Sequence, residues 1–156
     1  MNSGNIINQT KRKMKKYTVE FIGTFFLVLT VAMAGGMGAM APLAIGSALM
    51  IMVYAGGHIS GGHYNPAVTL GVMMRGAMDK GDVPGYMIAQ VLGGVVAALV
   101  GGYLGGGAET AKAIDVVPSL IAEIIGTFAL VYVILNVATA KGTSGNSYFG
   151  LAIGFT

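Results

Sequence analysis

A polar, glycine-rich stretch from His58 to Gly71 separates two apolar runs, and it constrains the fold more than any other part of the sequence. Gly61 and Gly62 allow an irregular backbone path that leaves carbonyl groups without partners. Asn65 is a residue type that caps helices, and Pro66 is tolerated in a first helical turn. The stretch therefore predicts a loop that leads directly into the N-terminus of a helix.

This helix is too short to cross a membrane, because residues 66–76 would span about 15 Å, roughly half of a bilayer core. The whole chain is nevertheless typical of a polytopic membrane protein, since 54% of its residues are hydrophobic and only 10% are charged. Irregular backbone within a membrane is tolerated only beside protein or water. The pattern indicates a re-entrant half-helix whose positive end and free amides serve a polar solute.

Four longer apolar segments are predicted to span the membrane, namely residues 17–34, 41–55, 83–105 and 116–140. Residues 148–156 begin a fifth segment, but nine residues are fewer than the roughly 20 that a span needs. Residues 1–10 show no hydrophobic periodicity and are predicted to be disordered. In the third span Gln90 is expected to face the bundle, and small residues recur every four positions, which favours close helix packing. These are Gly93, Ala97, Gly101 and Gly105.

Basic residues are concentrated before the first span, where Lys11, Arg12, Lys13, Lys15 and Lys16 lie within six positions. In the predicted topology eight of the nine Lys and Arg residues lie on one side, and only Lys112 lies on the other. The positive-inside rule then makes residues 1–16 a basic cytoplasmic tail. A nucleic-acid-binding tail and a cleaved signal peptide are the alternatives, but we expect no nucleic-acid partner, because juxtamembrane lysines usually determine topology.

The sequence contains an internal repeat. Residues 19–25 (VEFIGTF) recur as residues 122–128 (AEIIGTF), an offset of 103 positions. An odd number of predicted spans separates the two copies, so the second copy would enter the membrane from the opposite side, as in an inverted repeat. The chain has no cysteine, which excludes disulfides and thiolate metal sites, and no acid–base or nucleophile constellation that would indicate an enzyme.

The ten residues Ser60–Thr69 (SGGHYNPAVT) resemble the first Asn-Pro-Ala signature of the aquaporin, or major intrinsic protein, family. The resemblance implies an all-α membrane protein, an inverted-repeat bundle in which two half-helices meet at the membrane midplane. Residues 17–107 would form the first repeat and residues 108–156 an incomplete second one, truncated in the fifth span. The counterpart of Asn65 is expected near position 168, so the chain is interpreted as a fragment of the full channel.

By this resemblance the chain belongs to a passive channel for water or small neutral solutes such as glycerol, in a lipid bilayer, as a homo-oligomer that is a tetramer in the family. No cofactor is implied. Asn65 would donate to the passing solute, with Pro66 and Ala67 starting the half-helix. Backbone carbonyls along the inner vestibule would accept hydrogen bonds, and they belong to Gly61, Gly62, His63 and Tyr64.

Glu20 and Glu123 are carboxylates within predicted spans, and such groups are functional candidates by default. They resemble the buried glutamates with which the family braces its re-entrant loops. Snorkelling toward a membrane interface is the alternative. His58 and His63 could be metal ligands, but five residues apart in a glycine-rich loop, with no carboxylate beside them, is poor metal spacing.

Ile45 stands twenty residues before Asn65, where the family usually has an aromatic side chain of its outer filter. An aliphatic side chain leaves a wider and less polar constriction, which favours small neutral solutes beyond water. Two other functions stay open. A truncated, non-conducting protein would act only by oligomerisation, and a secondary transporter would also use inverted repeats, although no coupling charge lies near Asn65.

Overall fold

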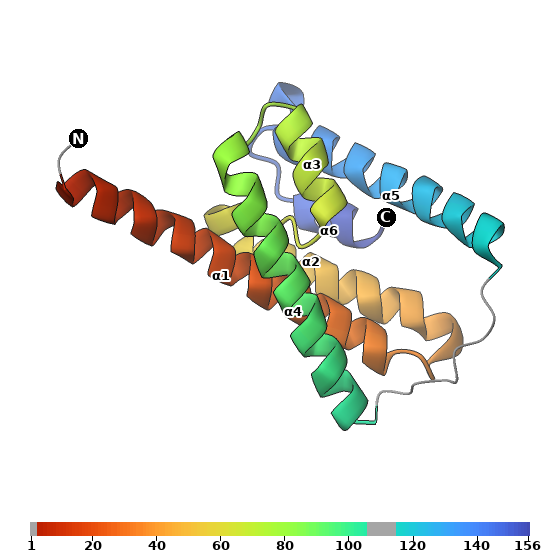
Figure 1. The fold of residues 1–156 in the computed structure, drawn as a ribbon. Coiled ribbons are helices and arrows are strands. Elements are labelled where there is room, and N and C mark those ends of the chain that lie inside the picture. Colours follow the sequence, from red (N-terminus) through yellow and green to blue (C-terminus); the bar gives the residue numbers. More distant parts are fainter. Residues whose placement is uncertain (1–2, 106–114) are drawn as a thin grey trace.

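The computed structural model describes residues 3–105 and 115–156, and all regular structure in these ranges is helical. The helices are α1 (Ser3–Met33), α2 (Ala41–Ser60), α3 (Pro66–Met74), α4 (Val83–Tyr103), α5 (Val116–Thr139) and α6 (Phe149–Gly154) (Figure 1). Short 3-10 turns connect them, namely η1 (Gly38–Met40), η2 (Lys80–Asp82) and η3 (Lys141–Thr143). Four of the described helices, α1, α2, α4 and α5, are long and apolar enough to cross a membrane. The four predicted spans and the short helix are thus confirmed, while Lys112 lies outside the described residues.

The prediction of disorder over residues 1–10 is wrong from Ser3 onward. These residues form the first turns of α1, which extend past the other helices in Figure 1. Adding residues to an existing helix avoids the cost of nucleation, so a polar segment can extend a membrane helix. The Thr10 hydroxyl also donates to the Ile6 carbonyl, 3.0 Å away.

The expected loop also begins later than predicted, because α2 continues through His58 and ends at Ser60. Gly56 lies inside this helix, and a Cβ there would be 2.2 Å from the hydroxyl of Tyr64 and 2.5 Å from Val19. The glycine is therefore a packing position and not a helix end. Local composition could not show this, because Tyr64 reaches Gly56 only through the fold.

Helices α1 and α4 cross at close range through the predicted small residues. A Cβ on Gly93 would lie 2.5 Å from the carbonyl oxygen of Phe21, and one on Gly101 would lie 2.8 Å from the Cβ of Ala32. Gly93, Ala97 and Gly101 are buried, which confirms the packing interpretation for these three positions. Gly105 lies exposed beyond the end of α4.

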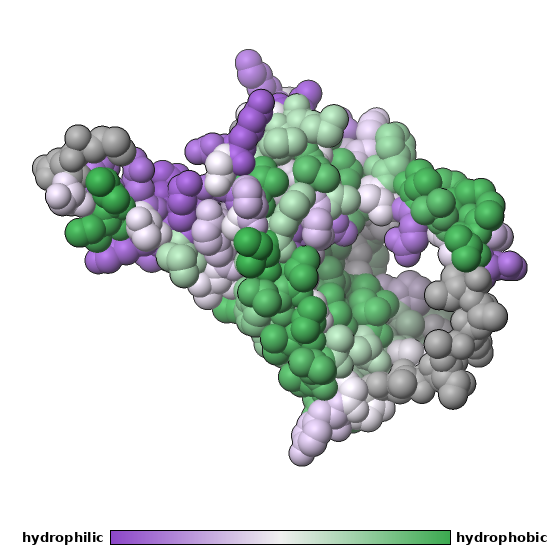
Figure 2. Space-filling model, viewed as in Figure 1, coloured by the Kyte–Doolittle hydropathy of each residue, from purple (hydrophilic) through white to green (hydrophobic). Residues whose placement is uncertain are grey.

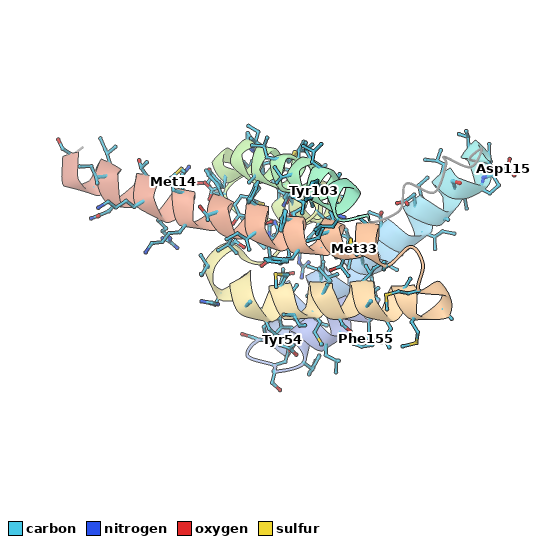
Figure 3. The ribbon with its side chains drawn as sticks, turned by 90° about the horizontal axis from the view of Figure 1, so that it is seen from below. Met14, Met33, Tyr54, Tyr103, Asp115 and Phe155 are labelled. Carbon is cyan, nitrogen blue, oxygen red and sulfur yellow. The ribbon has the colours of Figure 1, made fainter. Side chains whose placement is uncertain are left out.

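Helix α6 packs along α2, as Figure 3 shows on the side where Tyr54 and Phe155 are labelled. The helices approach closely at Gly46 and Gly154, where a Cβ on Gly154 would lie 2.5 Å from the Gly46 carbonyl oxygen. The Tyr54 hydroxyl donates to the Ser147 carbonyl at 3.0 Å and accepts from the Leu151 amide at 3.2 Å. These contacts fix the start of α6.

The short helix α3 lies between α4 and α5 (Figure 1). Val68 and Val72 face the buried core, where they join Val53 of α2, Ile134 of α5 and Ile153 of α6. A helix of nine residues has little stability of its own in isolation. Its position is therefore set by the buried face that Val68, Thr69 and Val72 present to these neighbours.

An ion-pair cluster joins α1 to the start of α4. The ammonium groups of Lys13 and Lys16 each lie 2.9 Å from a carboxylate oxygen of Asp82, whose side chain is almost fully buried. Two positive charges on α1 thus hold the negatively charged N-cap residue of α4 in place. The predicted tail is therefore tied to the bundle at its C-terminal end.

We expect Asp82→Asn to lower the free energy of unfolding by about 1–2 kcal/mol, because both ion pairs are lost from a partly buried position. Thermal melting in detergent measures this, and the difference from wild type should shrink at high salt because screening weakens the wild-type pairs. Asp79→Asn is the matched control, since asparagine can keep the cap that Asp79 makes with the Gly81 amide. Equal melting temperatures for both variants would contradict the structural role.

Candidate functional site: the re-entrant segment

The chain reverses between α2 and α3 through a run of unusual backbone conformations. Gly61 caps α2 with a φ of 96°, and its amide donates to the Gly57 carbonyl at 2.9 Å. Gly62 follows with a φ of 66°, and Tyr64 adopts a φ of 50°, a region that non-glycine residues seldom occupy. Such a path needs outside support, and Glu20 supplies it.

The carboxylate of Glu20 lies fully buried beneath the loop and accepts four hydrogen bonds. Oε1 accepts from the Ser60 hydroxyl at 2.6 Å and from the His63 amide at 3.0 Å. Oε2 accepts from the Tyr64 amide at 2.7 Å and from the Gln90 side chain at 2.8 Å. One side chain on α1 therefore holds the last turn of α2, two loop amides and α4 together.

The surroundings of the Glu20 carboxylate differ from those of a snorkelling side chain. A snorkelling side chain would place its charged end at an interface, whereas the carboxylate of Glu20 has no exposed surface. All of its partners in the described residues are donors. Removing the acceptor would leave buried loop amides without partners.

A second polar contact lies on the other side of the loop, at the hydroxyl of Thr69 on α3. His63 Nδ1 lies 3.1 Å from this oxygen, and Gln90 Nε2 donates to it at 2.9 Å. The hydroxyl is also within 3.2 Å of the Asn65 carbonyl. When its single proton goes to that carbonyl, the ring proton of His63 must be on Nδ1, and Nε2 is then an acceptor.

Tyr64 points its side chain away from the loop into the space between α1 and α2. The ring lies against Gly23, where a Cβ would be 2.1 Å from it, and the hydroxyl donates to the Met52 carbonyl at 2.8 Å. Tyr64 thus anchors the loop through its side chain. The backbone carbonyl of Tyr64 accepts no hydrogen bond from the described residues.

Asn65 begins α3 as predicted. Its Oδ1 accepts from the amide of Ala67 at 2.7 Å and from that of Val68 at 3.4 Å, and Pro66 occupies the first helical position. The side-chain nitrogen donates to none of the described residues. The cap therefore leaves a free donor at the positive end of the helix.

The loop carbonyls form a row without hydrogen-bond partners in the described residues. Within the described residues, none of four consecutive carbonyl groups accepts a hydrogen bond, and they are those of Gly61, Gly62, His63 and Tyr64. The Ser60 carbonyl just before them accepts from the Tyr86 hydroxyl. The unpaired row thus begins where the helix ends.

Two cavities open beside this row. One, of about 420 Å³, is lined by Lys16, His63, Asp82 and Tyr86 with parts of α3 and α5. The other, of about 700 Å³, lies between the end of α2 and the connection from α5 to α6, and His58 and Lys141 line it. The two cavities share Gly61 in their walls, and together they form a vestibule of mixed polarity on the side of the chain where the basic residues gather.

The other predicted site residues lie elsewhere. Ile45 is half-buried on α2 and lines neither vestibule cavity. Glu123 is exposed on α5, and the positions that would match the partners of Glu20 at the repeat offset lie beyond residue 156. Its bracing role remains a prediction. Within the described residues, no group of His and carboxylate side chains could hold a metal ion.

Sequence reasoning missed four residues of the site, and these are Ser60, Thr69, Asp82 and Tyr86. Ser60 and Thr69 belong to the ten-residue signature and could have been proposed as polar partners of the loop. Tyr86 is four residues before Gln90, so helical spacing places both on one face of α4. Nothing in the sequence pairs Asp82 with Lys13 and Lys16.

Comparison with known proteins agrees with this geometry. Residues 7–156 match the family described as Major intrinsic protein. The chain belongs to this family. A "Glycerol uptake facilitator protein-like 6" of Lactiplantibacillus plantarum is 39% identical to it, over 92% of this chain and 72% of that protein.

Plant members of the major intrinsic protein family are equally similar. "Aquaporin NIP1-1" of Zea mays is 39% identical over 92% of this chain, and "Aquaporin NIP1-3" of Oryza sativa is 40% identical over 91% of it. The chain spans 55% and 54% of the lengths of these two proteins. The membership confirms the predicted family, the all-α membrane fold and a place among channel proteins.

Proposed function

We propose that this chain lines one half of a passive pore for water or small neutral solutes, with Asn65 as the solute donor. The observation that carries the proposal is the free side-chain nitrogen of Asn65, which lies at the start of α3 next to a row of unpaired carbonyls. A donor beside a line of acceptors can replace the hydration of a hydroxyl-bearing solute. The positive end of α3 would oppose cations at the same point.

The vestibule supports a polar solute of small size. His63 and Tyr86 add polar groups to its wall, and the buried Glu20 keeps the loop carbonyls fixed in place. The relatives include proteins named for glycerol uptake and proteins named aquaporin, so both solutes are tested below. Ile45, aliphatic where an aromatic residue is usual, favours glycerol as a solute in addition to water.

In the proposed inverted repeat, a second half-helix near position 168 would face α3 across the pore. In the proposed topology the basic residues, the vestibule and the N-terminus lie in the cytoplasm. The functional unit would be a homo-oligomer, with Glu123 bracing the second loop as Glu20 braces the first. A non-conducting protein that acts by oligomerisation is the competing function.

The decisive measurement compares two proteins in lipid vesicles. One is residues 1–156 and the other is the protein as its gene encodes it, each tested for water and glycerol flux by stopped-flow light scattering. We expect selective flux from any form that supplies both half-helices. If the gene-encoded protein leaves both fluxes at the level of empty vesicles, the non-conducting function is correct.

The role of Asn65 is tested by Asn65→Asp in a conducting form. Aspartate also caps helices, so α3 should still begin at the same residue, but the donor is replaced by a negative charge at the positive helix end. We expect cation leakage to appear, measured as an electrical conductance across planar bilayers. Asn65→Ser is the control, because serine caps without a charge, and it should leave cation exclusion intact. Equal exclusion by both variants would remove Asn65 from the barrier.

A further inference from the structure

A shallow apolar groove lies on the outer surface between α1 and α4, away from the vestibule. Its volume is about 450 Å³. The α1 side is formed by Met14, Tyr17, Thr18 and Phe21, and the α4 side by Gly85, Ile88, Ala89 and Leu92. Met14, Ile88 and Leu92 are each more than half exposed, so nothing in the described chain covers the groove. In Figure 3, Met14 projects from the edge of α1 along which α4 lies.

Glycine shapes the floor of this groove. The ring of Tyr17 lies over Gly85, where a Cβ would be 2.3 Å from the ring carbon Cζ. Tyr17 also meets Tyr86 edge to face, with ring centroids 5.9 Å apart. The groove is therefore a packed surface with fixed walls. From Gly85 to Leu92 it runs about 10 Å along α4, into the predicted membrane depth.

Two exposed lysines, Lys11 and Lys15, lie at the end of the groove nearest the N-terminus of α1. Lys11 lies one turn before Met14 and two turns before Thr18, so helical spacing places it on the same face of α1. Lys15 lies one turn after Lys11 and one turn before Thr18. Both lysines are exposed, and neither forms an ion pair with a described residue, whereas Lys13 and Lys16 are held by Asp82.

The exposed lysines and the apolar groove lie side by side at the expected membrane surface. Figure 2 shows mostly hydrophilic colour along the projecting part of α1, with a small hydrophobic patch near its tip, and hydrophobic colour where α4 crosses it. Long lysine side chains reach from a helix toward the headgroup level while apolar residues stay below. Lysines near the end of a membrane helix attract anionic lipids with about 1 kcal/mol each.

We propose that this groove binds one anionic phospholipid, with an acyl chain against Met14, Ile88 and Leu92 and the phosphate against Lys11 and Lys15. Asp82 sharpens the selectivity, because it engages Lys13 and Lys16 in ion pairs and leaves Lys11 and Lys15 at the groove free to contact a headgroup. The site is separate from the solute path, since its lining shares no residue with either vestibule cavity. The proposed lipid site therefore does not depend on whether the chain conducts a solute.

Native mass spectrometry of the purified 156-residue chain in non-ionic detergent tests the headgroup contact. The probes are phosphatidylglycerol and phosphatidylcholine with identical long acyl chains. We expect tighter binding of phosphatidylglycerol, and Lys11→Gln with Lys15→Gln should weaken it about thirtyfold. Arg75→Gln with Lys141→Gln removes the same charge elsewhere and should leave it unchanged. Equal binding of the two lipids, or equal loss in the two double variants, would overturn the proposal.

The groove itself is tested by Leu92→Trp, which fills it from an exposed position. Leu99→Trp is the control, two turns further along the same face of α4 and outside the groove. Only Leu92→Trp should weaken phosphatidylglycerol binding, and both variants should keep the wild-type helical circular dichroism. Displacement of the lipid by equimolar inorganic phosphate would show a plain anion site, and loss of an oligomer in Leu92→Trp would show that a second copy occupies the groove. Either result would exclude a lipid site.

Discussion

Glu20→Leu should be among the most destabilising single substitutions in this chain. Four donors lose their acceptor at once, and each buried donor left without a partner costs about 1–3 kcal/mol. The effects are coupled, because the Ser60 hydroxyl and the amides of His63 and Tyr64 belong to one loop. We expect a loss of several kcal/mol in the free energy of unfolding and early proteolysis of the loop between α2 and α3.

Glu20→Gln removes the negative charge of the side chain but keeps its size and shape. Glutamine keeps one acceptor oxygen of similar reach, but its amide group faces donors that it cannot satisfy. Its thermal melting temperature in detergent should therefore lie between those of wild type and Glu20→Leu. Glu123→Leu, at the matching position of the repeat, is the control, because Glu123 is exposed on α5 in the described structure. Wild-type melting of both Glu20 variants would show that the carboxylate is not the brace of this loop.

The sequence predicted those parts of the fold that depend on local pattern. Apolar length located the four long helices, and the capping preference of Asn65 with Pro66 located the start of α3 correctly. Gln90 was expected to face the bundle, and it is almost fully buried between Glu20 and Thr69. In each case the predicted feature depends on residues that lie close together in the sequence.

Long-range contacts account for what the sequence did not show. Glu20 meets the loop 40 to 44 residues further along the chain, and Lys16 meets Asp82 at a separation of 66 residues. The helical state of Ser3–Thr10 follows from continuity with α1 and not from its own composition. The second span was predicted to end at residue 55, although α2 continues to Ser60 and Gly56 makes room for the Tyr64 hydroxyl.

The two copies of the repeat differ in their long-range contacts, and this difference leads to the second prediction with a large expected effect. Gly23 and Gly126 occupy matching positions, but a Cβ on Gly23 would be 2.1 Å from the Tyr64 ring, whereas one on Gly126 would have no described atom within 4 Å apart from its own helix backbone and chain neighbours. Gly23→Ala must therefore displace the ring that anchors the loop, and overpacking of this kind costs about 1–3 kcal/mol. Gly126→Ala meets no obstacle and should be neutral or gain up to about 1 kcal/mol from helix propensity.

Thermal melting of the 156-residue chain in detergent would measure both substitutions under the same conditions. We expect Gly23→Ala to melt clearly below wild type and Gly126→Ala at or above it. Tyr64→Leu provides the mechanistic check, because a smaller side chain makes room for the new methyl group. In that background Gly23→Ala should cost much less, which a double-mutant cycle would show as a coupling between positions 23 and 64. If Gly23→Ala is equally harmful with and without the tyrosine ring, another contact of α1 limits this position, and the ring is not what requires glycine there.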